Sequence, residues 1–82
     1  MERLDCNDIV KTIYNNYGSR IAAVFCLTEA YKYLQSENPD DIEKAICYFK
    51  YIEKSLFSSI NGSNTIRLYR DVKEMIKKYD KG

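Results

Sequence analysis

Few side chains in this sequence have the types and spacing that catalysis needs. The 82 residues include no histidine, so the usual general base is absent. The three glycines stand alone at positions 18, 62 and 82, and none belongs to a phosphate-binding loop. Asp40, Asp41 and the scattered glutamates suit helix caps and surface positions rather than a converging acid pair. We therefore expect a non-enzymatic protein with no catalytic residues and no cofactor.

The three cysteines, Cys6, Cys26 and Cys47, stand singly without a C-x-x-C pair. Because histidine is absent, a zinc site would need thiolates and a carboxylate from distant positions, and we expect no metal. The pattern is typical of reduced thiols in a cytoplasmic protein, with Cys26 packed as a small hydrophobic residue. A disulfide between Cys26 and Cys47 across a helix pair is the alternative, and Cys47 falls on the polar side of its predicted helix.

Charge is distributed unevenly along the chain, although the formal net charge is only +1. Residues 63–82 hold six basic and three acidic side chains. The basic residues that could contact the phosphates of a nucleic acid are Arg67, Arg70, Lys73, Lys77 and Lys78. Asp71 and Glu74 interrupt this series, and cations near a helix C-terminus also complement its dipole. A small nucleic-acid-binding or regulatory factor, of viral or plasmid origin, is the alternative function.

Three tyrosines fall outside the expected core faces, and we predict that they bind a partner: Tyr33, Tyr48 and Tyr51. Large amphipathic side chains outside a core are typical of interface anchors. The abundance of Ile, Lys, Asn and Tyr also fits an AT-rich genome, which supplies tyrosines without a binding role. The leading hypothesis is a protein–protein interaction module or small accessory subunit that self-associates or docks on a larger assembly.

Helical periodicity runs through most of the chain and predicts four helices. They lie within residues 1–17, around 21–34, over 41–60 and over 65–79. Asp5 or Asn7 suits the cap of the first helix, and Asp40 or Asp41 suits the cap of the third. The second helix is the least polar, and its predicted core face comprises Ile21, Val24, Leu27, Thr28, Tyr31 and Leu34, widened by Ala23 and Ala30.

Gly18 decides how the first two helices are related. It suits the residue that ends a helix, with Ser19 capping the next one. The alternative is a kink within one long helix, because the apolar series continues nearly in phase across the glycine. We favour the break, which lets the first helix fold back on the second.

No stretch alternates polar and apolar residues as a strand does. The short connections predict one all-α domain of residues 1–82, a small antiparallel up-and-down bundle of four helices. No apolar run approaches the roughly 20 residues of a membrane span. The charged N-terminus does not resemble a secretory signal, so we expect a cytoplasmic location.

Two motifs carry a family resemblance. The segment Asp41-x-Glu43-x-Ala45-Ile46-x-Tyr48-Phe49 resembles the second helix of a tetratricopeptide hairpin. With Tyr69-x-Asp71-x-x-Glu74-x-Ile76-Lys77 added, the order is more similar to a MIT domain, although Val72 and Lys73 replace that family's Arg-Ala. The resemblance implies a groove beside the last helix that binds a helical peptide, as in membrane-remodelling and trafficking proteins.

Overall fold

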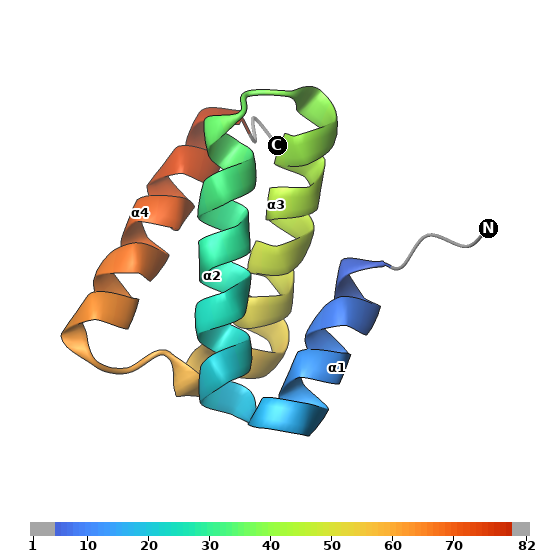
Figure 1. The fold of residues 1–82 in the computed structure, drawn as a ribbon. Coiled ribbons are helices and arrows are strands. Elements are labelled where there is room, and N and C mark those ends of the chain that lie inside the picture. Colours follow the sequence, from blue (N-terminus) through green and yellow to red (C-terminus); the bar gives the residue numbers. More distant parts are fainter. Residues whose placement is uncertain (1–4, 80–82) are drawn as a thin grey trace.

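The computed structural model describes residues 5–79, which form four α-helices and no strand. These are α1 (Cys6–Tyr17), α2 (Ser19–Gln35), α3 (Pro39–Tyr51) and α4 (Ser63–Tyr79). Helix α2 contacts all three others, while α1 and α4 lie on opposite sides of the α2–α3 pair (Figure 1). The all-α, four-helix prediction is confirmed for this part of the chain. The up-and-down order remains a prediction, and residues 1–4 of the expected first helix lie outside the described residues.

Gly18 separates α1 from α2, as the favoured reading predicted. Its φ of 95° is a backbone conformation that side-chain-bearing residues rarely adopt. The Gly18 N–H donates to the Tyr14 carbonyl oxygen, and the Gly18 carbonyl oxygen accepts from the Ala22 N–H. Gly18 therefore ends one helix and begins the next, and Ser19 is the first residue of α2 rather than its cap.

Helix α3 begins two residues earlier than predicted. Asn38 is its N-cap, because its Oδ1 accepts from the Asp40 N–H at 2.9 Å. Pro39 occupies the first turn, where a missing N–H costs nothing. Asp40 and Asp41 therefore lie in the first turn instead of capping it.

The predicted third helix over 41–60 is not regular to its end. The α-helix stops at Tyr51 and continues as a π-helical turn, Ile52–Leu56, and a 3₁₀ turn, Phe57–Ser59. The wider turn keeps both Ile52 and Leu56 in the core. The Tyr69 hydroxyl of α4 donates to Glu53 Oε2 of this turn at 3.1 Å, which ties the last helix to it.

The core lies where α2 faces its three neighbours. It contains residues from every helix: Cys6, Val10, Ala22, Ala23, Cys26, Leu27, Ala30, Leu34, Ala45, Tyr48, Phe49, Ile52, Leu56, Val72 and Ile76. Helical spacing in the sequence predicts inner faces that include Ala45 and Phe49 on α3 and Val72 on α4, and all three residues are buried. The same spacing places Ile66 and Tyr79 at the ends of the α4 face, and these two residues are exposed.

The predicted core face of α2 is rotated from the observed one. Ile21, Val24 and Thr28 are exposed, while Ala22 and Cys26, which lie outside the predicted face, are completely buried. The buried face therefore consists mainly of small residues, which allow neighbouring helices to approach closely. Leu27 and Leu34 belong to both faces and fill the space between the helices.

None of the helices among residues 5–79 combines the length and apolar character needed to cross a membrane.

Candidate functional site

A groove of about 630 Å³ runs between α1 and α3. Helix α1 contributes Asn7, Asp8 and Lys11 to its wall. The wall on the other side is formed by Glu43, Ile46, Cys47, Lys50, Tyr51, Lys54 and Ser55. Three lysines therefore face two carboxylates around an aliphatic and an aromatic side chain. The volume is in the range of small-ligand sites.

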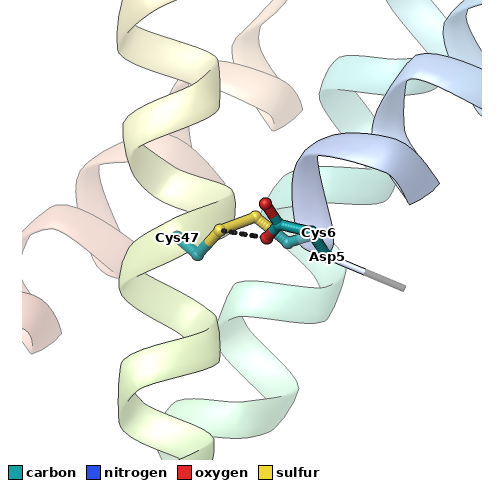
Figure 2. A group of neighbouring side chains, drawn as sticks. All are labelled: Asp5, Cys6 and Cys47. Atoms are coloured by element: carbon teal, nitrogen blue, oxygen red, sulfur yellow. Dashed lines mark hydrogen bonds between the residues drawn. A yellow bond between two sulfur atoms is a disulfide. The ribbon is translucent and has the colours of Figure 1, made fainter. Parts of the chain in front are cut away.

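One end of this groove is closed by a disulfide between Cys6 and Cys47, whose Cα atoms lie 6.4 Å apart (Figure 2). The sequence-based expectation of reduced thiols is therefore wrong for these two residues. The alternative pairing of Cys26 with Cys47 is also wrong. Periodicity places a cysteine on a helix face, but only the packing of α1 on α3 decides which two faces meet.

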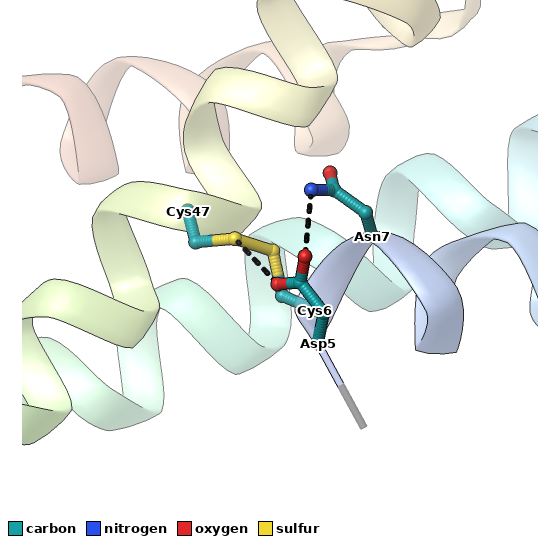
Figure 3. The surroundings of a disulfide bond; sticks show 4 residues. All are labelled: Asp5, Cys6, Asn7 and Cys47. Atoms are coloured by element: carbon teal, nitrogen blue, oxygen red, sulfur yellow. Dashed lines mark hydrogen bonds between the residues drawn. A yellow bond between two sulfur atoms is a disulfide. The ribbon is translucent and has the colours of Figure 1, made fainter. Parts of the chain in front are cut away.

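Asp5 lies beside the disulfide. Its Oδ1 is 3.8 Å from Cys47 Sγ, and its Oδ2 accepts from the Asn7 side-chain amide at 3.2 Å (Figure 3). A disulfide sulfur has no proton to donate, so the first of these becomes a hydrogen bond only when Cys47 is a thiol. The donor atoms of Asp5, Cys6 and Cys47 lie within 4.8 Å of one another. They could hold a thiophilic metal only after reduction, because bonded sulfurs are poor ligands.

The remaining cysteine, Cys26, is buried in the core and carries a free thiol. Burial raises the pKa of this thiol to about 12. Cys26 is therefore protonated and unreactive in the folded protein, as expected for a small hydrophobic residue.

The three predicted partner-binding tyrosines do not form one surface. Tyr48 is only 4% exposed, so the expectation that it lies outside the core is wrong. Its ring stacks on that of Tyr33 with centroids 6.2 Å apart, and burial raises the pKa of Tyr48 to about 12. Tyr33 is half-buried, with Lys44 Nζ 5.5 Å from its ring centroid. Tyr51 lies on the other side of α3, in the α1–α3 groove.

The five predicted nucleic-acid-binding residues are all exposed on α4. Among the described residues the one ion pair within 4.0 Å joins Lys32 to Glu29, so none of these five has a carboxylate partner at that distance. Lys73 Nζ instead lies 5.9 Å from the Tyr69 ring centroid. Arg67 and Arg70 share a small surface hollow with Asp71 and Glu74, which weakens the positive potential there.

A second groove lies between α2 and α4, where the MIT resemblance implies peptide binding. It has a volume of about 480 Å³ and an apolar part made by Tyr31 and Met75. Its remaining wall is formed by Asp71, Glu74, Lys77 and Lys78. These four charges are balanced in sign. Peptide binding in this groove remains a prediction.

The junction of α1 with α2 exposes large apolar side chains, of which periodicity assigned Ile21 and Val24 to the core. We call Tyr14, Tyr17, Ile21 and Val24 the α1–α2 corner. All four lie within seven residues of Gly18 and are 45–66% exposed. The signal that could have found them is charge, because Arg20 is the single charged residue between Thr12 and Thr28.

None of the family models, curated proteins or solved structures compared with this chain matches it.

Proposed function

We propose that this chain is a non-enzymatic interaction module that self-associates through the α1–α2 corner. The observation that supports the proposal is the exposure of four large apolar side chains on a nearly uncharged part of a chain that is 30% charged. Aromatic enrichment and depletion of charge distinguish the centre of an interface from ordinary surface. The two tyrosines and the near absence of charge give the corner this composition.

The exposed area is appropriate for a small interface. Taking about 150–200 Å² for a fully exposed side chain of this size, the four exposed fractions correspond to roughly 310–420 Å² of apolar surface per copy. The largest apolar patch of a typical monomer is about 300–600 Å² and is often functional. A standard interface buries about 800 Å² on each partner, of which somewhat more than half is apolar. We therefore expect a weak dimer, with a dissociation constant on the order of micromolar.

A second copy of the chain is the occupant that the charges favour. Nucleic acids and acidic peptides are recognised through complementary charge, which a surface with one arginine does not provide. A twofold interface brings the same patch to itself, so a nearly uncharged patch meets no like-charge repulsion beyond that of Arg20. Membership of a larger assembly would use the same corner.

Replacing both Tyr17 and Ile21 with serine is expected to weaken self-association at least tenfold, because these are the two most exposed residues of the corner. In sedimentation equilibrium, the apparent mass of the wild-type protein should rise with concentration from the 9.7 kDa of one chain toward twice that value. The double variant should remain monomeric over the same range.

The matched control replaces Ile66 and Tyr79 with serine. These residues are exposed to 43% and 39% and lie on α4, whose described residues make no contact with α1. This control should dimerise like the wild type. A wild-type protein that stays monomeric at several hundred micromolar, or a control that dissociates equally, would contradict the proposal.

The second candidate function is nucleic-acid binding by α4, favoured by its exposed cations, which have no carboxylate partner at ion-pair distance among residues 5–79. If it is correct, affinity for DNA or RNA should fall steeply as salt rises, because bound cations displace counterions. Replacing Arg67 and Arg70 with alanine should weaken binding. It should also reduce the slope of log affinity against log salt concentration by about two, which is the loss expected for two phosphate contacts. Fluorescence anisotropy between 50 and 200 mM salt measures both. Absent or salt-insensitive binding excludes this function.

A further inference from the structure

We propose that the Cys6–Cys47 disulfide is exchangeable, and that the α1–α3 groove docks the small anionic thiol that opens it. The thiol is of the glutathione class, and it attacks Cys47. The product is a mixed disulfide on Cys47 and a free thiolate on Cys6, with α1 no longer bonded to α3. This inference is independent of self-association through the α1–α2 corner.

The two sulfurs differ in access. Cys47 lines the groove and is half-buried, whereas Cys6 is only 8% exposed and does not line it. Thiol–disulfide exchange requires the attacking sulfur to reach one sulfur of the bond. The groove therefore directs attack to Cys47 Sγ.

The two sulfurs also differ as leaving groups. Cys6 is the first residue of α1, and the unpaired N–H groups of a first helical turn stabilise a negative charge. Asp5 Oδ1, 3.8 Å from Cys47 Sγ, disfavours a thiolate at Cys47, but the Asp5 carboxylate also lies within 4.8 Å of the Cys6 sulfur, so the helix N-terminus is what distinguishes the two sulfurs. Because Cys6 forms the more stable thiolate, it is the better leaving group, and exchange is faster when the incoming thiol attacks Cys47. Access to the sulfurs and stability of the leaving group thus both favour attack at Cys47 with Cys6 as the leaving group.

The charges around the groove match an anionic thiol. Lys50 of α3 and Lys54 of the π-helical turn after it both line the groove with Cys47, and Lys11 faces them from α1. Asp8 and Glu43 leave one net positive charge in the lining. The volume of about 630 Å³ is sufficient for a tripeptide-sized ligand.

The reaction is balanced in two steps. The incoming thiolate forms a sulfur–sulfur bond with Cys47 as the Cys47–Cys6 bond breaks, and Cys6 receives the electron pair. A second thiolate then attacks the sulfur of the bound thiol, which releases the small-molecule disulfide and leaves Cys47 reduced. The reverse sequence, with the small disulfide as oxidant, closes the bond again. In the cytoplasmic setting expected from the sequence, disulfides of this kind are usually transient.

The test mixes the oxidised full-length chain with reduced glutathione, quenches with acid and follows the intact mass. Peptide mapping should find the mixed disulfide on Cys47. Replacing Lys50 and Lys54 with glutamine should slow the reaction about three- to tenfold with glutathione, since two positive charges near the attack site are lost. The same variant should lose less rate with 2-mercaptoethanol, because its attacking thiolate carries no charge beyond that of the sulfur.

The matched control replaces Lys77 and Lys78 with glutamine, which removes the same charge from α4 on the far side of the bundle. It should react with both thiols as the wild type does. A mixed disulfide on Cys6, no exchange with millimolar glutathione, or an equal slowing with both thiols in the groove variant would overturn the proposal.

Discussion

Breaking the Cys6–Cys47 bond is expected to lower the melting temperature by about 15–30 °C. The bond joins residues 41 positions apart. In the chain-entropy account, closing a loop of this length removes about 4 kcal/mol of unfolded-state entropy at 25 °C. Each kcal/mol shifts the midpoint of a domain of this size by about 4–8 °C. For a chain of 82 residues the total stability is about 4–12 kcal/mol, so the bond accounts for a large share.

The effect should be largest in α1, because this helix has little else to hold it. Its buried residues are Cys6 and Val10, and its 12 residues are too few for a stable isolated helix. Hydrogen exchange after reduction should therefore show α1 amides losing protection before those of α2 and α3. Equal loss in all the helices would mean that the bond stabilises the fold as a whole.

Calorimetry of four samples separates the bond from the side effects of mutation. They are the wild type and the Cys6→Ser, Cys47→Ser double variant, each with and without a phosphine reductant. The reductant should lower the midpoint of the wild type and leave that of the double variant unchanged. A wild-type midpoint that does not respond to the reductant would show that the bond contributes no stability.

The sequence was sufficient for the kind and number of helices, and for the break at Gly18. Glycine acts locally, so the break at Gly18 is visible without knowledge of packing, whereas the cap of α3 was assigned to Asp40 or Asp41 instead of Asn38. The π-helical turn after Tyr51 was not predictable, because it depends on how Ile52 and Leu56 meet the core. The burial of Tyr48 was not predicted either, because it also depends on packing: its ring packs against those of Phe25 and Tyr33 on α2.

The candidate sites depended even more on tertiary packing. The Cys6–Cys47 pair and the α1–α3 groove exist only because α1 folds onto α3, and nothing local to either segment specifies that contact. Of the predicted site residues, Tyr51 lies in this groove and the five α4 cations are exposed. The exposure of the α1–α2 corner could not be predicted from periodicity, because α2 is apolar on most of its sides and hydrophobicity alone does not show which side faces inward.

The rotation of α2 leads to the second large prediction. Leu27→Ala is expected to destabilise the protein by about 2–5 kcal/mol, because Leu27 is completely buried and its truncation leaves a cavity. Ile21→Ala should change stability by no more than about 0.5 kcal/mol, since Ile21 is 52% exposed. If α2 instead buried the face predicted from periodicity, Leu27→Ala and Ile21→Ala would lower the stability by comparable amounts. Urea unfolding at low protein concentration, where self-association is negligible, compares them.

A third substitution tests the small-residue face directly. Ala30 is fully buried where α2 meets its neighbours, so Ala30→Leu should overpack the core and cost about 1–3 kcal/mol. Thr28→Leu adds a similar side chain on the exposed side and should be nearly neutral. Leucine also favours helices more than threonine does, so any change at position 28 should be slightly stabilising. If Thr28→Leu destabilised the protein as much as Ala30→Leu, the observed rotation of α2 would be incorrect, and the α1–α2 corner would have to be buried.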